Sequence, residues 1–451
     1  MKYINTLIII ALIIVFCMTS YLWHSQKEIS NLEMRSLATF NMVFNPSDVD
    51  SIVYKDTVIA RLEEAMKDQF VFRNIIVKKL SSLKARLGNI YDLTINCLKT
   101  YNDVPQTYKE YDHPKLEKFP AQQYKLTKIG DFYRIENTDY ICKKPKFKPY
   151  DSDSISFHVS QLQRIQDLYP QIKIYSYLVS SIDNTPWFDS YLGSKTPDRF
   201  EQIAQALPDN IKVKRLIYKD FQEYKELFFA SDHHLNYKGS LKSYRDIYEM
   251  LSEDFVLSEY NKPIKEWNFT ELFGVEYRGT RARRLKKEYS GWDKFITLEY
   301  DLGNRQTYAL NPKTLKEIPA VLSLLENYKN GNISMDIDYD HYIHFYGDAL
   351  LENGITVEDK EYIYIIRNNT KTGHNLLFVT DSTGRAIRDV LGTHFDTLVY
   401  LDCRIMSKID IDYIINKYKI DIILLNGLGS VWTDDKCVFR FSDDFSNKGG
   451  N

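Results

Sequence analysis

Short apolar segments rich in β-branched residues alternate with amphipathic segments along the chain, and this alternation limits the possible folds more than any other feature. Strands are predicted at 172–182, 211–216, 362–368, 375–381, 397–403 and 420–427. Helices are predicted at 154–170, 198–207, 236–251, 382–392 and 409–419. Strands that are apolar throughout and alternate with helices indicate a parallel sheet covered by helices on both faces. We therefore predict one α/β domain at 111–445, with an insertion at about 255–340.

The N-terminal segment indicates where this domain is located. The stretch from Tyr3 to Trp23 carries no charge and is long enough for a helix to cross a bilayer core of roughly 30 Å. Lys2 precedes this stretch, which favours a cytoplasmic N-terminus. A cleaved signal peptide is the alternative, but no small-x-small cleavage site follows the apolar stretch. We expect residues 1–24 to be a single-pass anchor in the cell membrane and the rest of the chain to lie outside the cytoplasm.

Residues 25–110 are expected to form a membrane-proximal helical segment. Apolar residues recur there at steps of three and four from Ile59 to Leu87, a spacing that predicts an amphipathic helix. The net charge of −2 and the charged fraction of 27% are ordinary for a globular protein. They give no argument for nucleic acid as a partner.

The five cysteines leave the disulfide pattern open. Cys17 lies in the predicted anchor, and the others are Cys97, Cys142, Cys403 and Cys437. Disulfides are permitted outside the cytoplasm, and four cysteines allow three pairings among which sequence cannot choose. No CxxC spacing is present, so we predict no structural zinc site.

The stretch FASDHHLNYKG, at 229–239, places an acid beside two histidines in a chain that has only nine. Within one turn, Asp232 and His234 can present their side chains on the same side, with the carboxylate reaching the imidazole Nδ1. The alternatives are a polar turn or a metal site formed by Asp232, His233 and either His341 or His344. Nothing in the spacing demands three convergent ligands, so no metal is predicted.

A second motif supplies the nucleophile that such an Asp–His pair would serve. In LLFVTDSTGRAIRDVLG, a predicted strand ends at Thr380 and Asp381, and Ser382 follows at the start of a helix. Active groups of open α/β sheets lie at the carboxyl ends of the strands. A serine needs a base to become nucleophilic, and the usual base is a histidine oriented by a carboxylate. The two motifs together predict a Ser382–His234–Asp232 triad, although Asp381 or Ser382 alone can simply cap a helix.

The basic run YRGTRARRLKK, at 277–287, has two interpretations. It is either a solvated loop or a contact site for an anionic glycan. Under the second interpretation Arg281 and Arg283 bind substrate, and Tyr346 joins them as part of a sugar platform.

The motifs resemble those of the DHHW family and of the alginate O-acetyltransferase-like proteins. FASDHHLNYKG is similar to the Asp-His-His-Trp motif, and VTDSTG is similar to the Gly-Asp-Ser nucleophile block that these proteins share with SGNH hydrolases. Three further segments are similar to stretches found in the same order in the family: NLEMRSL (31–37), LEEAMKDQFVFRN (62–74) and DYDHYIHFYGD (338–348). The resemblance implies an SGNH-hydrolase-like, flavodoxin-like domain behind an N-terminal transmembrane helix.

The resemblance also implies an activity, namely O-acetylation of a cell-envelope or secreted polysaccharide outside the cytoplasm through a Ser382 acyl-enzyme. His234 would be the base and Asp232 its orienting acid, and the backbone N–H groups near Ser382 and Thr383 would stabilise the oxyanion. Four further residues would support the site: Gly384, Asp381, His233 and Gly347. No cofactor is implied. A multi-spanning membrane acyltransferase would be the partner that passes the acetyl group across the membrane.

The chain departs from the family pattern at several positions. Leu235 replaces the Trp of the motif, Asn236 stands where Thr or Ser is common, and Thr380 replaces the Gly before Asp381. Asp348 stands where the family has Asn, and an acid there would repel an oxyanion. The departures at Leu235 and Asp348 keep one alternative open, a non-catalytic, anchored glycan-binding or assembly protein. A polysaccharide acetylesterase with the same triad is the other alternative, because the sequence does not report whether water is excluded from the acyl-enzyme.

Overall fold

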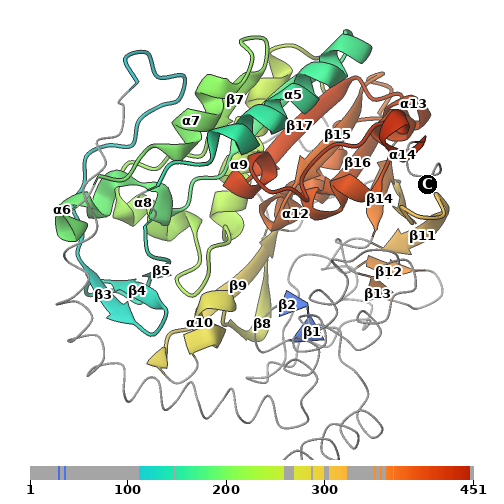
Figure 1. Ribbon diagram of the computed structural model, residues 1–451. Coiled ribbons are helices and arrows are strands. Elements are labelled where there is room, and N and C mark those ends of the chain that lie inside the picture. The colour runs from blue at the N-terminus through green and yellow to red at the C-terminus, as the bar shows by residue number, and fades with distance from the viewer. Residues whose placement is uncertain are drawn as a thin grey trace, which may run out of the picture. The chain divides into compact units, whose positions relative to one another are not determined.

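The protein is described from a computed structural model (Figure 1). The structure describes residues 29–30, 35–36 and 111–446, with gaps at 146–147, 194, 259–268, 286–287, 299–303, 322–348, 352–355, 358–361 and 369. The predicted anchor at 1–24 and the predicted helix at 59–87 lie outside these residues. Among the residues described, no helix is both long and apolar enough to span a membrane. Near the N-terminus, β1 (Ile29–Ser30) and β2 (Arg35–Ser36) pair antiparallel.

A ten-stranded mixed sheet forms the centre of the α/β domain. In spatial order its strands are β13 (Thr356–Val357), β12 (Ala349–Leu351), β11 (Glu317–Val321), β10 (Gln306–Leu310), β14 (Ile363–Arg367), β16 (Thr397–Asp402), β15 (Asn375–Thr380), β17 (Ile422–Gly427), β6 (Lys173–Leu178) and β7 (Lys212–Arg215). The five strands from β16 to β7 are parallel, as the alternation of strands and helices predicted.

The strand predicted at 362–368 forms, but its expected parallel direction is wrong. This strand, β14, runs antiparallel to β16 and to β10. Successive parallel strands need a crossover of about a dozen residues or more. Only the short segment 368–374 separates β14 from β15, so the chain reverses its direction there. Strands β10 and β11, from the segment at 255–340, extend the sheet on this antiparallel side.

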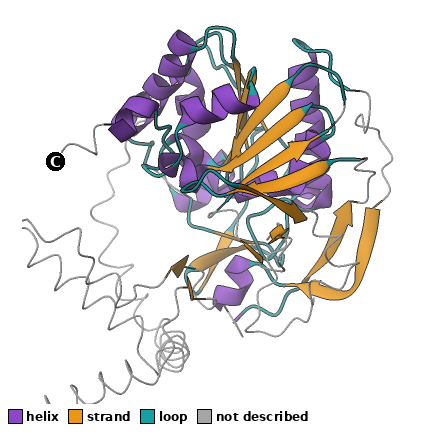
Figure 2. Cartoon of the chain, turned by 90° about the vertical axis from the view of Figure 1, so that its right-hand side faces the viewer, coloured by secondary structure: helices purple, strands orange, loops and turns teal. Residues whose placement is uncertain are grey.

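Helices cover both faces of the sheet, which Figure 2 shows. One face packs against α8 (Phe221–Leu227), α9 (Tyr237–Ser252) and α12 (Arg385–Gly392), and the other against α5 (Ser152–Leu168), α7 (Arg199–Ala206) and α13 (Ile411–Tyr418). Side chains of β15 alternate between the two cores: Phe378 belongs to the first, and Leu377 and Val379 to the second. This two-residue period is that of a strand buried on both faces.

Two smaller sheets complete the domain. One contains β3 (Leu126–Ile129), β4 (Phe132–Ile135) and β5 (Ile141–Cys142). The other pairs β8 (Phe269–Tyr277) with β9 (Asp293–Leu298), and α10 (Thr280–Leu285) lies between these two strands in the chain. The remaining short elements are α6 (Asp189–Leu192), α14 (Ser442–Ser446) and the 3₁₀ turns at Ile182–Asn184, Pro186–Phe188, Ser382–Gly384, Cys403–Lys408 and Gly429–Trp432.

Three of the four cysteines left open by the sequence are in the part that the structure describes. Cys142, Cys403 and Cys437 are buried free thiols, and Cys97 lies outside the described residues. The side chains of Cys403 and Cys437 hydrogen-bond to each other. Both belong to the core that packs against α5, α7 and α13.

Candidate active site

The Asp-His-His sequence occupies a tight loop between α8 and α9. Phe228 and Leu235 form an isolated antiparallel bridge, which closes the loop at its base. The Asn236 side chain caps α9 by accepting hydrogen bonds from Lys238 N and Gly239 N. This is the usual role of Asn at a helix N-terminus. The loop is therefore held at both ends, and its polar residues project between them.

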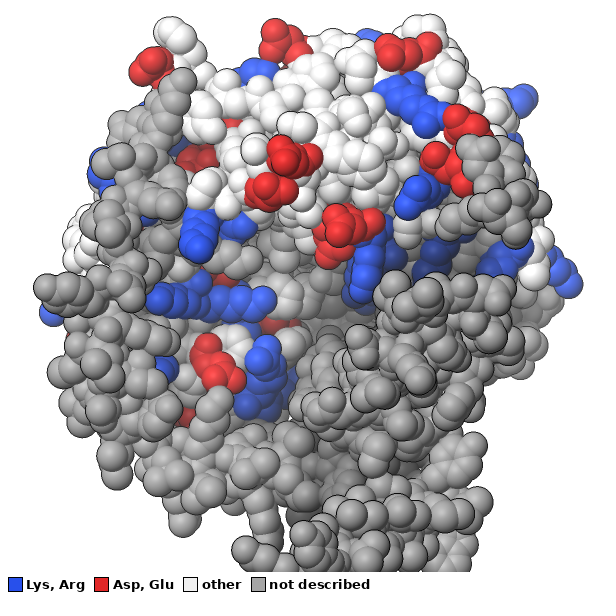
Figure 3. All heavy atoms as spheres, viewed as in Figure 1, with Lys and Arg blue, Asp and Glu red and all other residues white. Residues whose placement is uncertain are grey.

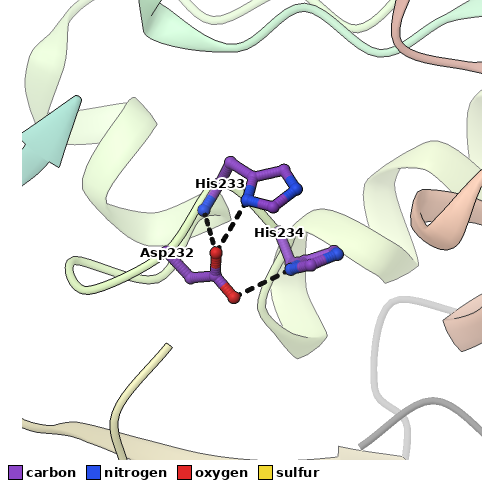
Figure 4. Close-up of side chains that lie close together, drawn as sticks. All are labelled: Asp232, His233 and His234. Carbon is purple, nitrogen blue, oxygen red and sulfur yellow. Dashed lines mark hydrogen bonds and ion pairs between the residues drawn. The ribbon is translucent and has the colours of Figure 1, made fainter. Parts of the chain in front are cut away.

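Asp232 binds both neighbouring imidazoles (Figure 4). Its Oδ1 accepts from His233 N and His233 Nδ1, both at 2.7 Å, and its Oδ2 accepts from His234 Nδ1 at 2.8 Å. The Asp232 side chain is fully buried. Burial alone would raise the pKa of this carboxyl, but the adjacent His234 and His233 hold its pKa well below the usual value. Asp232 is therefore a carboxylate at neutral pH.

Ser382 completes a continuous hydrogen-bonded chain with this pair. It follows β15 at the carboxyl edge of the sheet, and its Oγ lies 2.8 Å from His234 Nε2. A carboxylate can only accept hydrogen bonds, so His234 Nδ1 must carry the proton that Asp232 binds. In the neutral imidazole, Nε2 is then the acceptor for the Ser382 hydroxyl. The structure thus brings together the three residues that the sequence placed in a triad, in the order acid, imidazole, hydroxyl.

Asp381 fixes the turn that carries Ser382. Its Oδ1 accepts from Thr383 N at 2.9 Å and from Thr383 Oγ1 at 2.6 Å, and its Oδ2 accepts from Leu428 N at 2.8 Å. Gly427 has a φ of 145°, and a Cβ there would lie 2.8 Å from Asp381 Cγ. The last residue of β17 therefore needs to be glycine, both for its backbone conformation and for the close approach of Asp381.

These contacts change the expected set of oxyanion donors. Thr383 N–H donates to Asp381 Oδ1, and Gly384 N–H donates to the Asp381 carbonyl at 3.3 Å. Both groups are therefore occupied, and the expectation that Thr383 N–H faces an oxyanion is corrected. Gly384 instead allows the Thr380 side chain to approach, because a Cβ at residue 384 would lie 2.7 Å from Thr380 Cβ.

The segment with β8, α10 and β9 packs against the loop at 229–235, which carries Asp232 and is called the acid loop below. Asp293 accepts from Ala230 N at 2.8 Å and from Ser231 N at 2.9 Å, and it also binds Ser231 Oγ. Gly279 N–H donates to Ser231 Oγ at 2.8 Å. Gly279 also packs directly on the Asp232 side chain. The sequence analysis missed Asp293 and Gly279, because their relation to Asp232 depends on contacts between residues far apart in the chain.

The predicted substrate-binding arginines do not form an exposed basic site. Arg281 is only 2% exposed, and it donates to Ile141 O at 2.7 Å and pairs with Asp183 at 3.2 Å. Its assignment to a surface contact with an anionic glycan is therefore wrong. Arg283 is half-buried. Tyr346 and Gly347 lie outside the described residues, as do His341 and His344.

A buried acid with two arginines lies beside the serine turn, and the sequence analysis did not single it out. Asp402 ends β16, directly opposite Thr380 of β15, and is fully buried. Arg404 Nε donates to it at 2.8 Å, and Arg385 Nη2 lies 3.7 Å from it. An apolar strand ending in an acid, as at Thr380-Asp381, was the signal that could have revealed this site.

Lys and Arg side chains gather in a band across the middle of the face shown in Figure 3.

Asp232, His233 and His234 are also close enough to share a metal ion. Each offers one ligand atom, and these atoms lie within 4.8 Å of one another. However, Asp232 already uses both oxygens to bind His233 and His234. A metal would have to break the bonds that orient the imidazoles, so the geometry fits proton transfer better than metal binding.

Comparison with known proteins gives a match at the level of the fold. No family model and no curated protein matches the chain. Among solved structures, Bacillus cereus PatB1 is similar at 16% identity, with a TM-score of 0.50 over 70% of this chain and 100% of PatB1. The chain shares the fold of PatB1.

Two further solved structures are similar with lower TM-scores. A DHHW family protein from Eubacterium siraeum has 13% identity and a TM-score of 0.49, over 70% of this chain and 98% of its own. The O-acetyltransferase domain of Pseudomonas putida AlgJ has 9% identity and a TM-score of 0.34, over 69% of this chain and 94% of its own. The likeness that supports an argument is the one of fold with PatB1.

Proposed function

We propose that the protein is an acyltransferase that moves acetyl groups through Ser382 to a hydroxyl of a polysaccharide. The single observation that carries this proposal is the continuous chain of hydrogen bonds from Asp232 through His234 to Ser382. A non-catalytic remnant would have no reason to keep these bonds aligned. The motif resemblance supports the choice of acetyl as the acyl group and of polysaccharide as the acceptor.

In the first half-reaction, His234 Nε2 takes the hydroxyl proton of Ser382 while Oγ attacks the carbonyl carbon of the acetyl donor. The tetrahedral intermediate collapses, the donor's leaving group takes the proton from His234, and an acetyl-serine remains. Asp232 stabilises the imidazolium that forms in between, because it stays ionised.

In the second half-reaction, a sugar hydroxyl gives its proton to His234 Nε2 and attacks the acetyl-serine. Collapse releases the O-acetylated sugar, and the proton returns to Ser382 Oγ. Ser382 N–H is the donor that can serve the oxyanion in both steps. It makes no hydrogen bond within the described part of the chain, unlike the N–H groups of Thr383 and Gly384. A lost oxyanion donor typically costs about 3 kcal/mol of transition-state stabilisation.

The proposal places this reaction outside the cytoplasm, because the uncharged stretch from Tyr3 to Trp23 indicates an anchor. The acetyl donor must then cross the membrane. A multi-spanning acyltransferase is the partner we propose for that step, since one helix cannot form a conduit.

The decisive test is acylation of the full-length protein by p-nitrophenyl acetate, read by intact mass after a rapid acid quench. We expect one acetyl adduct on the native protein and none on Ser382→Ala. His234→Ala should form the adduct at least about 10²-fold more slowly. The matched control is Ser252→Ala, an exposed serine at the end of α9, which should behave like the native protein. An adduct that persists on Ser382→Ala, or no adduct on a folded native protein, would refute the proposal.

Adding oligosaccharides then separates transfer from hydrolysis. Acetylated oligosaccharide is the result expected of a transferase, whereas free acetate alone would identify an acetylesterase with the same three residues. The acceptor, and not the triad, distinguishes the two activities.

A further inference from the structure

One cavity of the domain contains none of the triad residues. This pocket has a volume of about 470 Å³ and is formed by three segments of the chain: 111–119, the residue at 149, and 184–202. The last of these segments follows β6, whose carboxyl end lies in the parallel part of the sheet beside β17. One side of the pocket is therefore formed by a segment that follows a parallel strand, and ligands of open α/β sheets bind at such segments.

The walls of the pocket expose more apolar than polar surface. The apolar part comprises two aromatic rings and four prolines: Tyr111, Phe119, Pro114, Pro149, Pro186 and Pro197. The Phe119 ring packs on Tyr218 with centroids 4.9 Å apart, and the Arg215 guanidinium lies 4.8 Å from its centre. Prolines have a fixed φ and little freedom to lose when a ligand binds. A pocket built in this way is preformed.

The acidic side chains of the lining are mostly used by the protein itself. Asp198 accepts from Glu201 N and pairs with Arg215 at 2.8 Å. Glu201 accepts from Lys115 N at 2.7 Å and from Leu116 N at 3.0 Å. Neither acid is therefore an unpaired charge that would demand a cationic ligand.

Two acceptors in the lining remain for a ligand. Asp189 uses Oδ1 to bind Thr196, through N at 2.9 Å and Oγ1 at 2.5 Å. Its Oδ2 makes no hydrogen bond in the described part of the chain, and the nearby charge of Lys195 acts on this carboxylate. Asn184 donates from Nδ2 to Ser181 Oγ at 3.3 Å, and its Oδ1 likewise makes no hydrogen bond among the described residues. Both atoms accept hydrogen bonds, so they fit hydroxyl groups. Lys118 and Lys195 also line the pocket, but both side chains are exposed, so solvent screens their charges and they do not select an anionic ligand.

We propose that this pocket binds a neutral hexopyranose residue of the acceptor polysaccharide, away from the residue that is acetylated. A pyranose ring presents apolar C–H faces to rings and prolines, and its hydroxyls donate to Asp189 Oδ2 and Asn184 Oδ1. The inference rests on the proposed function, because it takes the acceptor to be a polysaccharide.

The pocket is also connected to the triad through a short series of contacts. Asn184 follows Asp183, and Asp183 pairs with the buried Arg281. Arg281 in turn lies close enough to Asp232 to interact with its charge. A sugar held beside Asn184 would therefore lie next to residues that interact with Asp232, and the proposal takes one extended polysaccharide chain to reach both places.

The test measures binding and acylation separately on the full-length protein. Isothermal titration uses cellohexaose and maltohexaose as neutral probes and hexagalacturonate as the anionic probe. We expect at least one neutral probe to bind saturably, and Asn184→Ala and Asp189→Asn each to raise its Kd by roughly tenfold. Acylation of Ser382 by p-nitrophenyl acetate should stay at the native rate in both variants. The matched control is Asn416→Ala, an exposed asparagine on α13, which should not change Kd.

Three results would overturn the inference: no saturable binding of either neutral probe, a Kd that the two pocket variants leave unchanged, or tighter binding of hexagalacturonate. Thermal unfolding checks that each variant is folded, and Tyr111→Ala serves as a third variant at a half-buried position if one of the first two fails to fold. Loss of Ser382 acylation with intact sugar binding would count against the proposed function alone. The opposite pattern would count against the pocket alone.

Discussion

The Gly279→Ala substitution tests whether the packing behind Asp232 sets the geometry of the triad. A Cβ at residue 279 would lie closest to Asp232 Cβ, and also 2.6 Å from Asp232 Cγ and 2.8 Å from Asp232 Oδ2, whereas ordinary contact begins at 3.4 Å. The carboxylate must therefore retreat by about 1 Å. The φ of Gly279 is not in the left-handed region, so alanine brings no backbone strain of its own.

A displacement of this size is enough to break the hydrogen bond between Asp232 and His234. Asp232 Oδ2 lies 2.8 Å from His234 Nδ1, and a retreat of about 1 Å takes this distance beyond the range of a hydrogen bond. Displacements of this size in a catalytic group typically cost about 10²-fold in rate. We expect kcat/KM for p-nitrophenyl acetate to fall by about 10²-fold, measured from initial rates of p-nitrophenol release.

The control is a glycine whose substitution affects folding but not the site. Gly193 has a φ of 65°, and no atom lies within 4 Å of the place that a Cβ would take there. Gly193→Ala should therefore cost about 1 kcal/mol of stability through backbone strain and leave kcat/KM unchanged. Thermal unfolding of both variants separates the two effects. A folded Gly279→Ala protein with native kcat/KM would refute the argument that this packing positions Asp232.

Three further predictions concern stability and reactivity. Replacing Asp293 by Asn leaves at least one buried donor of the acid loop unpaired, and we expect urea titration to show a loss of about 1–3 kcal/mol in the free energy of unfolding. Hydrogen bonding to Lys212 lowers the pKa of Asp254 from 3.8 to about 2. The ionised Asp254 therefore adds its full contribution to the free energy of unfolding above pH 3.8, and this contribution is lost as the pH falls through 2. Asp254→Asn should therefore be less stable than the native protein at pH 7, with a difference that shrinks in unfolding curves as the pH falls from 3.8 through 2; a constant difference would contradict this. Burial raises the pKa of the Cys142 thiol, so iodoacetamide at pH 8 should label it only after unfolding, as peptide mass mapping would show, and rapid labelling of the folded protein would contradict its burial.

The parallel part of the sheet could be predicted because its signal is local. Continuous apolar runs such as 375–380 and 422–427 form buried strands whose ends agree with the prediction to within a few residues. The turn after β15 was predictable for the same reason, since an apolar strand, a polar turn and a helix follow one another in the chain. The direction of β14 was not, because it depends on the strand that lies beside it.

In the candidate site, too, the features set by neighbouring residues were predictable and those set by contacts between distant segments were not. Asp232 and His234 are neighbours in the chain, so their pairing could be anticipated from a single turn. The burial of Arg281 could not, because a run rich in arginine has the composition of a surface loop. Its partner Asp183 lies on a distant segment, and only the fold brings the two together. The catalytic roles themselves stay predictions until acylation is measured.

The position of β17 determines when the domain can fold. It is the last strand of the ten-stranded sheet in chain order, yet it lies between β15 and β6 and pairs with both. Until residue 427 has been synthesised, no strand joins the two halves of the parallel sheet, and β6 and β15 each present an apolar edge. Such edges promote aggregation, and pairings between distant segments form slowly. These two edges therefore need protection until β17 has been synthesised, and a chain truncated before β17 would leave the β15 and β6 parts of the sheet unjoined.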